Sequence, residues 1–155
     1  DSNMFCVVNT ALANGKLSVP YRTEKPEATR HKDCIIIACG NTWGTGQGSR
    51  IYNGRNAIDG ATLDRFTSVK VDYDNGLERK LVGAHENAYN FLIQLREKVQ
   101  EKNLQRIVST RAFVKANKHL SNGISLNEFA LTLTKSWDSR EIAKLDFADL
   151  ISEHA

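Results

Sequence analysis

Apolar residues recur at helical spacing at the start of the chain and throughout its second half. Phe5, Val8 and Leu12 fall on one face of a helix, and Asn14-Gly15 predicts where that helix ends. From Ser125 the chain reads Ser-x-x-Glu, a capping box in which serine and glutamate satisfy each other's free backbone N–H groups. After Gly76 the pattern predicts helices from about Leu77 or Asn87 to Lys102, from Ser109 to about Leu120, from Ser125 onward, and over about 139–153.

Two apolar runs are typical of strands rather than helices. Residues 34–39 are continuous, apolar and β-branched, which is the pattern of a strand covered on both faces in a parallel sheet. Residues 67–73 form a second predicted strand, and residues 16–21 alternate like a short edge strand or hairpin arm. The sequence therefore predicts an α/β fold, with two parallel-sheet strands plus helices over residues 1–75, followed by an all-α bundle over residues 76–155.

A glycine-rich stretch separates the two predicted strands. Residues 40–60 hold six of the chain's ten glycines. A loop of about 15 to 20 residues is rare in a compact domain unless it has a function. Trp43, Arg50, Tyr52 and Arg55 are available there for contacts with a pore or a subunit interface. The alternative, held open, is a plain connector in which Trp43 covers the core.

The composition is that of an ordinary globular protein. The 155 residues are 41% hydrophobic, and their net charge of +3 is a weak argument for a nucleic-acid or membrane surface. The longest apolar run is far too short to span a bilayer, and residues 1–4 do not begin a secretory signal. Cys6, Cys34 and Cys39 indicate reduced, mostly buried thiols in a cytoplasmic protein, and no His/Cys spacing predicts a structural metal.

The first residue that suggests chemistry is Asn41, which follows the predicted strand 34–39. In open α/β sheets, ligands bind beyond the carboxyl ends of the strands. An amide at that place can donate to a phosphate oxygen and can also orient an attacking water. Taken alone, the motif favours the simpler interpretation that Asn41 begins a turn.

Arg65 is the second candidate, carried by a short helix predicted over residues 59–66 just before the second strand. A guanidinium can stabilise the charge that develops on a transferring phosphoryl group, often across a subunit boundary. The alternative is a surface salt bridge between Arg65 and Asp64 or Asp59, and taken alone this alternative is the stronger one.

Arg111 is the third candidate, in the first turn of a helix of the predicted bundle. The helix dipole favours anions at that end, so an arginine there is poorly placed for helix stability. It is well placed to hold an anionic ligand together with the helix N-terminus. The alternative is an exposed arginine without a ligand.

The order and spacing of the three motifs resemble the second half of an AAA+ ATPase, closest to the MoxR-type and cobaltochelatase-ATPase-subunit branch. Residues 9–15, Asn-Thr-Ala-Leu-Ala-Asn-Gly, look like the helix after that family's Walker B strand. The resemblance implies that Asn41 is sensor 1, that Arg65 is the arginine finger acting in trans, and that Arg111 is the sensor 2 arginine of the lid. It implies that residues 1–75 belong to the α/β core and residues 76–155 to the lid.

The sequence departs from the family at the phosphate-binding elements. No G-x-x-x-x-G-K-[ST] phosphate loop is present, and no strand ending in paired acids precedes residues 9–15. We therefore expect the C-terminal part of a longer ATPase, which would use ATP and Mg²⁺ when complete but not as this chain alone. The resemblance implies that the phosphate-loop strand lies between the two strands kept here, so residues 34–39 and 67–73 should expose unpaired edges. Either the two strands pair directly, or another chain fills the gap.

The resemblance also implies partners. The complete protein would form a homo-oligomeric ring in a bacterial or phage-type cytoplasm, and a von Willebrand A-type domain protein is a possible partner. The work done would be remodelling of a protein or assistance to metal insertion.

A nucleic-acid-binding module is the alternative function. The helices predicted over residues 109–120 and from Ser125 are joined by a short glycine-containing turn, the outline of a helix-turn-helix. Arg111, Lys115, Lys118 and Lys135 would contact phosphates. The low net charge and the few side chains suited to base edges argue against it.

Overall fold

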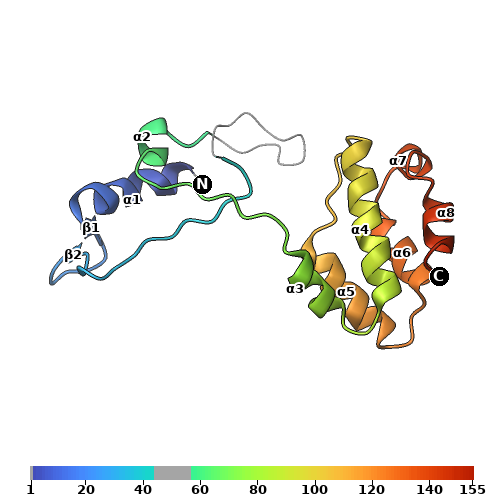
Figure 1. Cartoon of the computed structure of the whole chain (residues 1–155). Helices are drawn as coiled ribbons and strands as arrows, with labels where there is room; N and C mark the ends of the chain where they lie inside the picture. Colours follow the sequence, from blue (N-terminus) through green and yellow to red (C-terminus); the bar gives the residue numbers. More distant parts are fainter. Residues whose placement is uncertain (1, 44–56) are drawn as a thin grey trace. The chain divides into compact units, whose positions relative to one another are not determined.

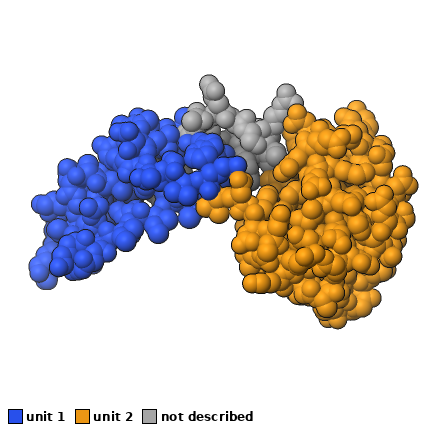
Figure 2. Space-filling view, in the orientation of Figure 1, with its two compact units in different colours: residues 1–70 blue, residues 71–155 orange. Residues whose placement is uncertain are grey.

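The computed structural model describes residues 2–43 and 57–155, and it divides into two compact units, Asp1–Lys70 and Val71–Ala155 (Figures 1 and 2). Helices dominate the second unit, whereas much of the first lies outside helices and strands, and the one sheet of the described residues has two short strands. The sequence analysis placed the domain boundary at residues 75/76, and the two units divide between Lys70 and Val71. Each unit is described by itself.

The first unit begins with helix α1, Ser2–Asn14. The helix ends where Gly15 takes a φ of +69°, a left-handed conformation that glycine adopts without steric cost. Strand β1, Lys16–Ser18, follows directly and pairs antiparallel with β2, Glu27–Thr29. The hairpin arm expected over residues 16–21 is therefore confirmed in its first half. The short helix α2, Gly60–Leu63, lies within the helix predicted over residues 59–66.

The predicted parallel sheet is wrong for the described residues. Residues 34–39 and 67–73 form no strand, and the only sheet there is the antiparallel β1–β2 pair. Ile35 is 84% exposed and Val71 is 88% exposed. The apolar pattern indicates burial, but a strand also needs a neighbouring strand to pair with its backbone N–H and C=O groups. Among the described residues, neither segment pairs with a strand. The fold class is α-rich rather than α/β.

The prediction that the cysteine side chains are mostly buried is also wrong. Cys34 and Cys39 are exposed free cysteines. Their burial depended on the strand that the structure does not form. The side chain of Cys6 lies outside the described residues.

The second unit is a helical bundle, as predicted. Helix α5 packs against α3, α4 and α6, and α8 packs against α4 and α6 (Figure 1). The capping box at Ser125 and Glu128 is confirmed, with both reciprocal hydrogen bonds formed. The helices are α3, Asn75–Val82; α4, Glu86–Glu101; α5, Thr110–Leu120; α6, Leu126–Thr134; α7, Ser139–Ala143; and α8, Phe147–Ser152.

Two of the predicted helices are interrupted by residues with positive φ. Gly83, at φ +69°, ends α3 before α4 begins. The chain therefore forms two helices, whereas the sequence also allowed a single helix from Leu77 to Lys102. Asp146, at φ +48°, separates α7 from α8 within the helix expected over residues 139–153. An aspartate tolerates the left-handed region better than most residues, which is why the second break leaves little trace in the sequence.

The buried hydrophobic core of the described residues lies entirely in the second unit. Phe91, Phe113 and Phe129 are fully buried there, and burying each side chain contributes on the order of 1.5–3 kcal/mol. Phe91 meets Phe147 edge-on with ring centroids 6.1 Å apart, which joins α4 to α8. The bundle therefore has the packing of an independent folding unit.

Candidate functional site

Thr62 fixes the short helix that carries Arg65. The Thr62 side chain is 1% exposed and hydrogen-bonds Asn9 of α1, whose Nδ2 lies 2.7 Å from the threonine Oγ1. Its backbone N–H donates to Oδ2 of Asp59 at 3.3 Å, which caps the start of α2. The sequence did not predict this anchor, because Asn9 and Thr62 are 53 residues apart and no local pattern links them.

Arg65 itself is exposed just beyond α2. Its Nη1 donates to the backbone oxygen of Ala61, one turn earlier. Neither Asp59 nor Asp64 forms an ion pair with it among the residues that the structure describes, so the salt-bridge alternative is not what the structure shows. The guanidinium is held along its own helix and keeps donors directed to solvent.

Asn41 lies in an exposed bend after Gly40. Its side chain makes no hydrogen bond within the described ranges, which fits the simpler interpretation of a turn as well as that of a ligand contact. Trp43 is 59% exposed and does not cover a core in this part of the chain. The other residues proposed for the glycine-rich loop, Arg50, Tyr52 and Arg55, lie outside the described residues.

Arg111 is exposed in the first turn of α5. The N-cap residue Ser109 makes no side-chain capping bond, so part of the polar helix end is left to other partners. In the same turn, Thr110 Oγ1 donates to Glu78 Oε1 at 2.8 Å, a hydrogen bond between two side chains. No acidic side chain pairs with Arg111 among the described residues, and the guanidinium is open to an anionic ligand.

A buried ion pair lies behind this helix end. Arg96 Nη2 lies 2.7 Å from Glu78 Oε1, and its Nη1 lies 2.9 Å from Glu78 Oε2, a bidentate pair. Arg96 Nε also donates to the backbone oxygen of Val108 at 2.8 Å. The guanidinium lies 3.8 Å from the ring centroid of Tyr73. These contacts join α3, α4 and the segment before α5, and the two charges cancel each other next to the α5 N-terminus.

The sequence analysis missed both members of this pair. The signal was present: Arg96 directly follows Leu95 and shares the buried face of α4 with Leu92 and Val99. A charged residue on the apolar face of a helix either lies at the edge of the core, where it stays exposed, or is buried together with a partner of opposite charge. Only the fold decides between these outcomes, because the partner lies 18 residues earlier in the sequence.

The three predicted residues are divided between the two units. Asn41 and Arg65 belong to residues 1–70 and Arg111 to residues 71–155, and no hydrogen bond or ion pair joins Asn41 to Arg65 in the described part of the chain. No group of three or more histidine, cysteine, aspartate or glutamate side chains in that part could hold a metal ion. The sequence of this chain also contains no G-x-x-x-x-G-K-[ST] phosphate loop.

No protein-family model, no curated protein and no solved structure matches the chain. Among the described helices, none combines the length and the apolar character needed to cross a membrane.

Proposed function

We propose that the chain supplies the sensor 1, arginine-finger and lid segments of an AAA+ ATPase, which couples ATP hydrolysis to remodelling of a protein or metal-insertion partner. The observation that carries this proposal is the exposure of Ile35, Ile37, Val69 and Val71 in two β-branched segments without strand partners. Such residues favour strands and are costly to leave in water in a contiguous patch. If the strand that belongs between these two segments is missing from a sheet, both segments lose their pairing partner and their apolar side chains stay exposed.

Arg65 and Arg111 are the residues that would contact nucleotide in the proposed ATPase. Arg65 and Arg111 are both exposed, and neither is neutralised by a carboxylate among the described residues. Arg65 would act on a nucleotide bound by a neighbouring subunit, and Arg111 would couple the bundle to a nucleotide bound outside it. Asn41 would orient the attacking water. Further chain must supply the phosphate loop and the acidic pair.

The proposal includes assembly and partners. A finger acting in trans requires copies of the same chain around a ring, so the complete protein would be homo-oligomeric and cytoplasmic. A protein with a von Willebrand A-type domain is the proposed partner for the remodelling step.

The coding sequence upstream of Asp1 tests this proposal. A G-x-x-x-x-G-K-[ST] motif after a predicted strand, followed by a strand ending in two acids, is the expected result. A reading frame that extends upstream without either element would contradict it, and so would a stop codon close before Asp1.

A basic stripe on α5 favours the alternative of a nucleic-acid-binding module. Arg111, Lys115 and Lys118 are all exposed at one-turn spacing along the helix, and Lys135 is exposed just after α6. Side chains at this spacing could follow a phosphate backbone. A gel shift with duplex DNA that weakens steeply between low and physiological salt would favour this alternative, and the absence of any shift at low salt would remove it.

A further inference from the structure

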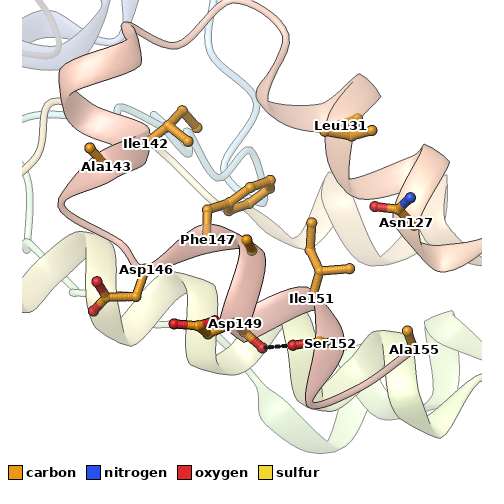
Figure 3. A pocket seen from close by; sticks show the side chains of 11 residues that line it. Asn127, Leu131, Ile142, Ala143, Asp146, Phe147, Asp149, Ile151, Ser152 and Ala155 are labelled. Atoms are coloured by element: carbon orange, nitrogen blue, oxygen red, sulfur yellow. Dashed lines mark hydrogen bonds between the residues drawn. The ribbon is translucent and has the colours of Figure 1, made fainter.

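A groove in the second unit has an apolar floor that nothing in the proposed ATPase function uses. It lies between α6, α7 and α8 and holds about 660 Å³. Leu131 of α6, Ile142 of α7, and Phe147 and Ile151 of α8 converge on it (Figure 3). Leu131 is 55% exposed. A large apolar side chain at the edge of an apolar hollow is the pattern of a protein contact surface.

The groove is open rather than enclosed. Most of the residues that line it are exposed, including Ala143, Ala148 and Ser152. A small molecule would keep much of its surface in water there, whereas ligand sites usually bury most of a small ligand. A helix can lay one face into such a groove and leave the opposite face solvated.

The charge of the lining selects the partner. Asp146 and Asp149 lie along one side of the groove, and no lysine or arginine lines it (Figure 3). Asp146 meets its nearest cation, Lys98, only at 3.9 Å. The carboxylate of Asp149 has no ion pair among the described residues, and only its backbone oxygen is engaged, by Ser152 and Glu153.

The backbone conformation of Asp146 keeps its carboxylate from capping α8. It is the N-cap residue of α8, where an aspartate side chain ordinarily accepts a hydrogen bond from the first turn. With φ at +48°, its side chain makes no such bond. The carboxylate is therefore not engaged by the helix backbone, and its contact with Lys98 is the long one at 3.9 Å.

We propose that the groove binds an amphipathic helix of a partner protein, whose apolar ridge fills the floor and whose lysine or arginine residues pair with Asp146 and Asp149. Leu131 is the central apolar contact. Spacing of the partner's apolar residues at i, i+3 or i+4, and i+7 matches one helix face. The proposal is independent of nucleotide binding, because Arg111, Arg65 and Asn41 do not line the groove.

Fluorescence anisotropy tests the proposal with the 155-residue chain and a labelled synthetic helix of about five turns, leucine on one face and lysine on the other. We expect saturable, micromolar binding that weakens with salt, and much weaker binding of the same helix with glutamate in place of lysine. Leu131→Ala should raise the Kd about tenfold. Asp149→Asn should raise it about two- to fivefold, as for an exposed ion pair.

Two matched variants separate the groove from general surface effects. Val114→Ala removes an exposed apolar side chain on α5, and Glu97→Gln removes an exposed carboxylate on α4, both outside the groove. Both should bind the lysine helix like the wild-type chain, and circular dichroism checks that every variant is folded. Equal binding of the lysine and glutamate helices would overturn the proposal, as would equal binding by Leu131→Ala and wild type. Absence of saturation at about 1 mM, or dimerisation of the chain that Leu131→Ala abolishes, would also overturn it.

Discussion

Arg96 and Arg111 are both helical arginines of the second unit, and their surroundings are opposite. Arg96 is 8% exposed and satisfied by Glu78, Val108 and Tyr73, whereas Arg111 is exposed on the first turn of α5. Breaking a buried pair leaves an uncompensated charge in a region of low dielectric constant. The same residue type therefore stabilises the bundle in one place and is available for binding in the other.

Arg96→Ala should lower the free energy of unfolding by about 3–5 kcal/mol, because it leaves the Glu78 carboxylate buried and unpaired. Urea unfolding followed by circular dichroism measures this. Arg111→Ala is the matched control and should change stability by no more than about 0.5 kcal/mol. Similar stability of the two variants would show that the Glu78–Arg96 pair does not hold the bundle together.

Glu141 makes stability depend on pH. Arg106 donates two hydrogen bonds to a single carboxylate oxygen of Glu141, from Nη2 at 2.6 Å and from Nε at 2.9 Å to Oε2. These bonds lower the pKa of Glu141 below its ordinary value of 4.5, and the backbone N–H of Asp138 adds to this. A lowered pKa in the folded state means that the stabilisation is fully present above the unfolded pKa. It is lost as the pH falls through the folded value.

The melting temperature of the wild-type chain should therefore exceed that of Glu141→Gln at neutral pH. The difference should shrink as the pH falls below the ordinary value of 4.5 and through the lowered pKa of the folded chain, because the wild-type carboxylate then becomes protonated. The comparison isolates Glu141, since every other carboxylate is common to both chains. A difference that stays constant across this range would rule out the charged pair as its source.

The sequence indicates candidate site residues by their type and order, but it does not show which side chains they contact. Arg65 and Arg111 are exposed, as a binding role requires. The contacts of Thr62 with Asn9 and of Arg96 with Glu78 were missed, since they join residues that are distant in the sequence. Local patterns carry no information about which distant polar group will be opposite.

At the element scale, most of the helical content of residues 75–152 was predictable from local signals, namely apolar periodicity and, for α6, the capping box at Ser125 and Glu128. Residues 34–39 carry only the signal for burial. A helix satisfies its backbone within one segment, whereas a strand depends on a neighbour that the sequence pattern does not name. This difference explains why the bundle was predicted and the parallel sheet was not formed.

The turn between α3 and α4 offers a prediction at this scale. Gly83 has φ +69° and ψ −132°, and a Cβ there would lie 3.2 Å from Oδ1 of Asn117. Asn117 cannot move freely, because its Nδ2 donates to the backbone oxygen of Leu81 at 3.0 Å. Gly83→Ala should therefore cost about 1–3 kcal/mol of unfolding free energy.

Gly123→Ala is the control for this effect. Gly123 also has a positive φ, +83°, but a Cβ there would meet nothing within 4 Å. Gly123→Ala should lower the free energy of unfolding by less than Gly83→Ala in the same urea titration, because only the unfavourable backbone conformation of alanine opposes it. Equal losses would show that crowding against Asn117 contributes nothing.

At the scale of the whole molecule, the described residues differ sharply in how well they bury apolar side chains. The core residues are all in the second unit, while Ile35, Ile37, Val69 and Val71 remain exposed. This contrast underlies the proposal that residues 34–39 and 67–73 complete a sheet with further chain. It also makes Arg65, just before the second segment, the residue on which the proposed chemistry depends most.

The most direct test is the rate of ATP hydrolysis by the proposed complete protein, in which a phosphate loop would precede this chain, with and without Arg65→Ala. A trans-acting arginine stabilises transition-state charge, so the variant should lose about 10³-fold or more in kcat. Nucleotide affinity should stay within a few-fold of wild type, and mixing with phosphate-loop-defective subunits should restore part of the activity. Wild-type kcat in Arg65→Ala would contradict the assignment of this chain to an AAA+ ATPase.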